Sequence, residues 1–82
     1  GHYAWARNYF SSGKADQATF HFKKTLQLDP ENGPAHNDFG ALLANQGKLA
    51  EAEAHFRRAL VIDPDDALAK RNLKLLNQLR NK

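Results

Sequence analysis

The chain has 82 residues, of which 41% are hydrophobic and 26% are charged, and its formal net charge is +3. This length fits one domain and excludes a large multidomain enzyme, while the apolar content is too high for a disordered chain. The absence of cysteine excludes a disulfide framework, a thiolate zinc site and a cysteine nucleophile. No run approaches the roughly 20 apolar residues of a membrane helix, so we expect a soluble protein without membrane insertion, with the cytoplasm as default compartment.

A pair of helices is predicted in the first part of the chain. The first helix ends at Gly13, because glycine adopts the left-handed backbone of a helix end without a Cβ penalty. The second helix is predicted over residues 15–28, where the pair Asp29-Pro30 ends it because proline lacks an amide donor. The residues that recur every four positions on one face of this helix are Ala18, Phe22 and Leu26.

A second pair follows the same plan. Asn32 and Pro34 mark the start of its first helix, and Gly47 marks the turn. Its second helix is predicted over residues 49–62. The apolar face of this helix carries Ala52, Phe56 and Leu60. Since no segment alternates with a period of two for long enough to form a strand, the predicted class is all-α.

The two pairs are copies of one another, related by the shift that places residue 1 on residue 35. Nine of the positions aligned in this way are identical, in the turns as well as on the apolar faces. The matched positions are His2 and His36, Gly13 and Gly47, Lys14 and Lys48, Ala18 and Ala52, His21 and His55, Phe22 and Phe56, Leu26 and Leu60, Asp29 and Asp63, and Pro30 and Pro64. Residues 69–82 resemble the first half of the unit once more.

This pattern resembles the tetratricopeptide repeat, a helix-turn-helix of about 34 residues with Trp, Leu-Gly, Tyr, Ala, Phe and Pro at fixed spacing. The second unit holds His36, Phe39-Gly40, Leu43, Ala52, Phe56 and Pro64 at those places, and the first holds His2, Trp5-Ala6, Tyr9, Ala18, Phe22 and Pro30. The departures are histidine in place of the leading tryptophan in both units, and Thr25 where the second unit has Ala59.

The resemblance implies one domain that forms an all-α, right-handed superhelical array of antiparallel helix pairs, an α-solenoid of five helices. It divides the chain into repeat one at 1–32, repeat two at 33–66 and a capping or partial-repeat helix at 67–82. We expect the small residues Ala6 and Gly40 to face Ala18 and Ala52, so that the helices approach closely while the phenylalanines fill the layer between neighbours.

In an array of this kind the first helix of each unit lines a concave groove, which the resemblance implies is the binding surface for a protein or peptide partner. The candidate groove residues are Tyr3, Arg7, Phe10, Asn37, Asn45, Arg71, Leu75 and Leu79. Arginine, aromatic and asparagine side chains suit a peptide backbone with an acidic or aromatic side chain. The lysine and asparagine clamp that some members use to hold a chaperone's C-terminal carboxylate is absent, since Arg7, Asp38 and Asn72 stand among its places.

The last predicted helix has more leucine than one buried face requires. We expect Leu73 to pack on the second unit, which leaves Leu75, Leu76 and Leu79 to face the groove or the place of a next helix. Three explanations stay open for these leucines. They bind the partner, they mediate a homo-oligomer through the C-terminal helix, or they mark a longer parent array.

No catalytic, cofactor or metal site is indicated by the sequence, and we expect no enzyme. The four histidines occupy equivalent places in successive units, without a zinc-binding spacing, so structural or surface roles are expected for them. Ser11 and Ser12 stand in a turn without a nucleophile setting, and the glycines occur singly, which excludes a phosphate-cradling loop.

The positive charge is modest and does not favour nucleic-acid binding, because a binding stripe would be denser and would carry free aromatic side chains. The basic residues concentrate in the last helix and in two outward pairs: Lys70, Arg71, Lys74, Arg80 and Lys82, then Lys23-Lys24 and Arg57-Arg58. The predicted function is therefore a protein-protein interaction scaffold that binds a peptide segment or helix of a partner in its concave groove. The alternative is a self-assembly module that oligomerises through its terminal helices.

Overall fold

The computed structural model describes residues 2–81, which form five α-helices and, within that range, no strand. The helices are α1 (His2–Ser11), α2 (Ala15–Leu28), α3 (Gly33–Asn45), α4 (Leu49–Ile62) and α5 (Ala67–Arg80). The predicted all-α solenoid of five helices is confirmed, and the predicted bounds 15–28 and 49–62 agree with α2 and α4. Gly1 and Lys82, the outer limits of the predicted repeat segments, lie outside the described residues.

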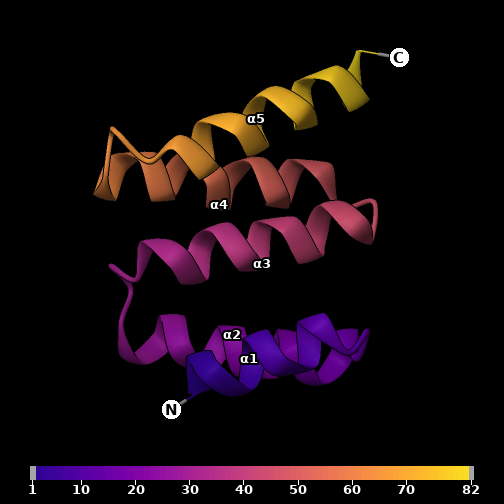
Figure 1. Cartoon of the computed structure of the whole chain (residues 1–82), viewed down its shortest axis with the longest axis vertical. Helices are drawn as coiled ribbons and strands as arrows, with labels where there is room; N and C mark the ends of the chain where they lie inside the picture. The colour runs from indigo at the N-terminus through magenta and orange to yellow at the C-terminus, as the bar shows by residue number, and fades with distance from the viewer. Residues whose placement is uncertain (1, 82) are drawn as a thin grey trace.

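The molecule measures 34 × 25 × 17 Å along its principal axes, and the helices stack along the longest of them (Figure 1). Each helix packs on the next one in the chain, and α3 also touches both α1 and α5. In Figure 1 α1 and α2 overlap at one end of the stack, and α5 lies at the other end beyond α4. The middle helix α3 therefore adjoins both α1 and α5, and we call the surface that these three helices form the inner wall.

Two glycines close the turns inside the helix pairs. Gly13 has φ of 74° and Gly47 has φ of 79°, the left-handed values predicted for them. In each turn the backbone N–H of the following lysine donates to a carbonyl five residues back, from Lys14 to Tyr9 at 2.9 Å and from Lys48 to Leu43 at 2.9 Å. These bonds satisfy carbonyls that a helix end would otherwise leave without a donor.

Replacing Gly47 by alanine is expected to destabilise the protein by about 1–2 kcal/mol, because a Cβ is unfavourable in the left-handed region. The site offers open space, so the backbone conformation alone causes the loss. Gly33→Ala is the matched control, since its new Cβ would make only an ordinary contact at 3.8 Å with Ile62. Urea unfolding should show that Gly33→Ala is neutral or stabilising by up to about 1 kcal/mol. Equal losses in the two variants would contradict this account.

Side chains cap the helices that follow the two Asp-Pro turns. Asn32 Oδ1 accepts a hydrogen bond from the N–H of Ala35 at 3.1 Å, as its predicted place before α3 requires. Asp66 does the same for Ala69 at the start of α5, also at 3.1 Å. The loops between the helix pairs therefore end in fixed geometry, which sets the direction of the next helix.

The core is formed by the predicted phenylalanines and the small residues opposite them. Phe22 and Phe56 are buried, and the ring of Phe22 stacks on that of Phe39 at a centroid distance of 5.6 Å, which joins α2 to α3. Ala52 is buried as expected, but it is not the residue that limits the space at Gly40. A Cβ at Gly40 would lie 2.6 Å from a ring carbon of Phe56, so glycine is required by the aromatic ring.

The last helix packs differently from the expectation for its leucines. Leu76 is buried in the core and Leu73 packs against it, whereas Leu75 and Leu79 are exposed. The prediction that Leu76 is left over from the core is therefore wrong, although Leu76 also borders a pocket between α3 and α5. The reason is helical geometry, because Leu73 and Leu76 are three residues apart and share the face that contacts α3 and α4.

Helix α5 is polar at the repeat positions that α3 uses to pack on α4. In α3 this face carries the buried residues His36, Gly40 and Leu43. At the equivalent places of the repeat, α5 carries Lys70, Lys74 and Asn77, all of them exposed. Hence α5 lacks the residues with which α3 packs on α4, and its outer face is solvated.

Candidate functional site

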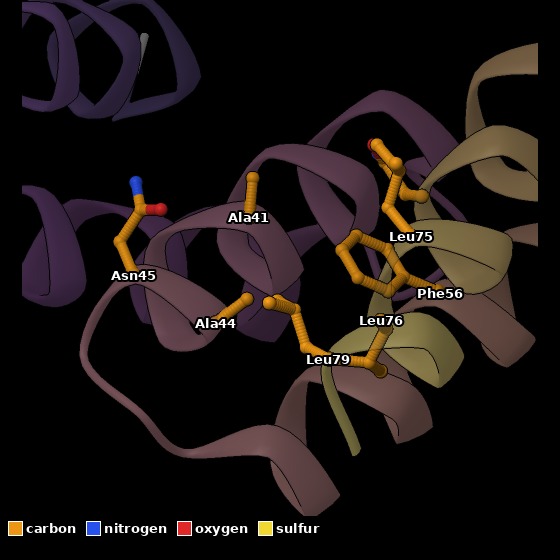
Figure 2. Close-up of a pocket in the computed structure, with 8 residues that line it drawn as sticks. Ala41, Ala44, Asn45, Phe56, Leu75, Leu76 and Leu79 are labelled. Atoms are coloured by element: carbon orange, nitrogen blue, oxygen red, sulfur yellow. The ribbon is translucent and has the colours of Figure 1, made fainter. Parts of the chain in front are cut away.

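The inner wall is hollowed by a pocket between α3 and α5, which we call the α3–α5 pocket (Figure 2). Its volume is about 190 Å³. The residues that line it are Ala41, Ala44, Asn45, Phe56, Asn72, Leu75, Leu76 and Leu79. Three of the predicted groove residues, Asn45, Leu75 and Leu79, are therefore brought together here.

The side chains of this pocket follow from the spacing on two helices. Ala41 and Ala44 are three residues apart on α3 and present only methyl groups, which opens the space. Leu75 and Leu79 are four residues apart on α5 and border the same space, with exposed fractions of 47% and 54%. In Figure 2 the side chains of Leu79 and Ala44 point toward one another across the pocket. The result is an apolar hollow with two accessible leucines at its edge.

A second hollow, the turn pocket, lies where the turn after α1 meets the end of α3. Its volume is about 240 Å³. It is lined by Phe10, Gly13, Ala15, Leu42, Asn45 and Gln46. Phe10, another predicted groove residue, contributes its ring, and Asn45 borders both pockets. The Asn45 amide thus stands between two apolar hollows, where it offers a donor and an acceptor to a main chain.

At the junction of α1 and α3, two predicted groove residues bind the same carboxylate. The Tyr3 hydroxyl donates to Asp38 at 2.9 Å, and the Arg7 guanidinium lies 3.6 Å from the same oxygen. Partial burial raises the pKa of Tyr3 to about 12, and the bond to Asp38 adds to the rise. Burial also raises the pKa of Asp38, although the Tyr3 hydroxyl and the Arg7 charge oppose this. Arg7 therefore already has an anionic partner.

Arg71 differs from Arg7 in this respect. It lies one helical turn before Leu75 on α5 and is exposed. Among the ion pairs of residues 2–81, none includes Arg71. Its positive charge is thus available beside the α3–α5 pocket.

The structure corrects the prediction for Asn37. Its side chain is only 2% exposed, and its amide nitrogen donates to Asp66 at 2.7 Å. The amide oxygen is buried without a partner among the described residues. Because Asp66 also caps α5, the Asn37 bond ties α3 to the start of α5. Asn37 is a structural residue beneath the wall and is not accessible to a partner.

Sequence reasoning missed how the histidines pair. His2 Nδ1 lies 3.0 Å from His21 Nδ1, and His36 Nδ1 lies 3.0 Å from His55 Nδ1. In both cases the partners are 19 residues apart, one on each helix of a pair. The comparison between units relates His2 to His36, and it does not reveal that each histidine contacts a second histidine within its own unit. The sequence did contain an indication of these pairs, since the two positions that meet in each unit hold histidine in both units.

The part of the chain that the structure describes holds no group of three or more histidine, cysteine, aspartate or glutamate side chains placed to bind a metal ion. Within residues 2–81, no helix is both long and apolar enough to cross a bilayer. The inner wall carries two apolar pockets, the Asn45 amide that borders both of them, and the Arg71 guanidinium, which forms no ion pair among residues 2–81.

Comparison with known proteins agrees with this architecture. A family model described as tetratricopeptide repeat matches residues 9–79, which is most of the chain. No curated protein matches the chain. Tetratricopeptide repeats generally mediate protein-protein interaction, and the family is typically a non-enzymatic scaffold. On the match to the family model and on the stacked helix pairs, the chain belongs to the tetratricopeptide repeat family.

Proposed function

We propose that the inner wall binds a segment of another protein that places an apolar side chain in the α3–α5 pocket and a carboxylate beside Arg71. The observation that carries this proposal is the pocket itself, with Leu75 and Leu79 accessible at its edge. The class of partner follows from the family, whose repeats generally mediate protein-protein interaction.

The size of the pocket supports a side chain as its occupant. Its volume of about 190 Å³ is below the roughly 300–1,000 Å³ of sites that enclose a small-molecule ligand. Burying one aliphatic or aromatic side chain contributes about 1.5–3 kcal/mol, which makes such a pocket a natural anchor point in an interface. Asn45 and Asn72 border the apolar surface and supply hydrogen bonds that fix the direction of the bound chain.

The charge of the wall supports an acidic neighbour for that side chain. Arg7 is already bound to Asp38, whereas Arg71 is exposed and lies one turn from Leu75. A carboxylate on the bound segment accepts two parallel hydrogen bonds from such a guanidinium. Because the pair would be exposed to solvent, its contribution is about 0.2–1 kcal/mol, less than that of the apolar anchor.

Titration with synthetic peptides, followed by amide NMR shifts, tests the proposal. The probe is an amphipathic peptide with leucines one helical turn apart and acidic residues beside them, and the comparison peptide carries lysine in place of the acidic residues. We expect the acidic peptide to shift the amides of Asn45, Leu75 and Leu79. Leu79→Ala should weaken binding about tenfold, and Arg71→Gln about two- to fivefold.

Two matched variants control for general effects on the fold. Lys70→Gln removes a neighbouring charge on the outer face of α5, and Leu28→Ala removes an exposed leucine from the end of α2. Both should leave affinity unchanged. Shifts confined to the outer helices α2 and α4, or equal losses in the control variants, would reject the groove assignment.

The alternative, self-assembly through the terminal helices, uses the same exposed leucines of α5. It predicts that light scattering detects dimers whose population rises with concentration and falls in Leu79→Ala. A monomer that binds the acidic peptide favours the proposal, and a peptide-insensitive dimer favours the alternative.

A further inference from the structure

The two histidine pairs share a geometry that depends on the number of protons they carry. Each pair joins the two helices of one unit through Nδ1 atoms that lie 3.0 Å apart. A hydrogen bond at this distance needs one protonated and one bare nitrogen. Both imidazoles can therefore share the contact only while at least one Nδ1 has no proton.

In the second pair the proton positions follow from a third group. His36 Nε2 lies 2.9 Å from the carbonyl oxygen of Pro30, which only accepts, so Nε2 carries a proton. In neutral His36 the Nδ1 is then the acceptor, and His55 Nδ1 is the donor. A first added proton enters at His55 Nε2 and leaves this bond intact. A second must enter at His36 Nδ1, where it meets the N–H of His55.

We propose that each histidine pair is an acid-sensitive clasp, which holds the two helices of its unit together at neutral pH and releases them when both imidazoles are protonated. The second clasp also holds the loop before α3, because His36 bonds to Pro30 as well as to His55. The same residues stand at equivalent places in α1 and α2, so the device is present twice.

The surroundings of the pairs do not supply enough negative charge to offset the second proton. Burial lowers the pKa of His55, and repulsion between the charged forms of His55 and His36 lowers it further, while Glu51 acts in the opposite direction. The rings of Trp5, Tyr9 and Phe20 pack on His21. The charged residues of the helices that carry the pairs are Arg7 on α1, Asp16, Lys23 and Lys24 on α2, Asp38 on α3, and Glu51, Glu53, Arg57 and Arg58 on α4. Positive charges therefore outnumber negative ones by five to four on these helices.

The direction of the pH effect follows from proton counting. Unfolded histidines titrate with a pKa of about 6.5, and each unfolded pair then takes up two protons. The folded pair takes up one without breaking its bond, so the unfolded state binds more protons in acid. The stabilisation is therefore complete above the ordinary histidine pKa of about 6.5 and is lost as the pH falls below it, where the unfolded chain takes up the second proton and the intact pair does not.

Release of the second clasp would also disturb the proposed binding surface. The α3–α5 pocket is lined by Ala41 and Ala44 of α3 and by Phe56 of α4, one residue after His55. Separation of α3 from α4 changes the distance between these walls. This coupling of acid to partner binding rests on the proposed function, whereas the effect on stability does not.

Thermal unfolding at about pH 7.5 and about pH 5, on either side of the ordinary histidine pKa of about 6.5, tests the clasps. The wild-type melting temperature should fall by at least about 4 °C at the lower pH. In the double variant His21→Asn and His55→Asn the fall should be less than half as large, because asparagine keeps a hydrogen bond to the facing Nδ1 and does not titrate. Equal falls in the two proteins would overturn the proposal.

Glu53→Gln is the control for acid effects that arise from carboxylates. Hydrogen bonds from Arg57 and Arg80 lower the pKa of Glu53, so its contribution is lost only in stronger acid. This variant should retain the wild-type fall between the two pH values.

Imidazole ¹⁵N shifts of the wild-type chain give a readout that needs no variant. They should show the Nε2–H tautomer for neutral His36 and the Nδ1–H tautomer for neutral His55, and the reverse would contradict the clasp. If the clasps respond as expected but no acidic peptide binds at any pH, the proposed function fails and the clasps stand.

Discussion

Replacing Phe56 by alanine is expected to destabilise the protein by about 3–5 kcal/mol, the largest effect that we predict for a single substitution. The Phe56 ring is 2% exposed, closes against the backbone of Gly40 and lines the α3–α5 pocket together with Leu76. Its removal leaves a cavity where α3, α4 and α5 meet. Since a chain of 82 residues has a total stability of about 4–12 kcal/mol, the loss removes at least about a quarter of it, and urea unfolding should find a midpoint at much lower urea than in the wild type.

Phe20→Ala is the matched control for this experiment. Phe20 is also helical and aromatic, but its side chain is 54% exposed on the outer face of α2. Its loss should cost less than about 1 kcal/mol, because little area returns to water. Comparable losses in the two variants would mean that Phe56 does not form the layer between the helices.

Gly40→Ala is expected to destabilise the protein by about 1–2 kcal/mol through overpacking, although alanine is the better helix former. The new methyl group would lie 2.6 Å from one ring carbon of Phe56 and 2.8 Å from another, closer than such atoms approach in folded proteins. Overpacking costs about 1–3 kcal/mol, and the gain in helix propensity of about 1 kcal/mol offsets only part of it. Denaturant unfolding of the purified variant measures the difference.

A double-mutant cycle separates the clash from other effects of the methyl group. In a background with Phe56→Leu, the side chain is smaller, so Gly40→Ala should cost less than in the wild type or become stabilising. Ala54→Gly, at an exposed position of α4, gives the helix-propensity term alone and should cost about 0.5–1 kcal/mol. Additive costs in the cycle would show that Phe56 is not the obstacle.

The places of the helices and their ends could be predicted because local chemistry decides them. Glycine at 13 and 47 is required by a positive φ, and the Asp-Pro pairs end α2 and α4 through a missing donor. The repeat period then related these local features across the two units. Such features involve residues close in the chain, so no knowledge of tertiary contacts was needed to place them.

The candidate site was predicted only in part. Phe10, Asn45, Leu75 and Leu79 line the pockets as a groove surface requires, and Arg71 is exposed beside one of them. The burial of Asn37 was not visible, because its partner Asp66 lies 29 residues further along the chain. The carboxylate that binds Tyr3 and Arg7 belongs to α3, which the spacing within α1 could not reveal.

By itself, then, the amino-acid sequence determined the class, the five helices, their turns and the residue types of the core, since each depends on backbone preference and on the period of apolar side chains. Only the tertiary structure decided which side chains meet between helices. Ala6 and Gly40 stand at equivalent places, and at position 40 the ring of Phe56 excludes even one methyl group. The histidine pairs and the buried Leu76 were decided in the same way, because close packing depends on distances of a few tenths of an ångström between residues far apart in the chain.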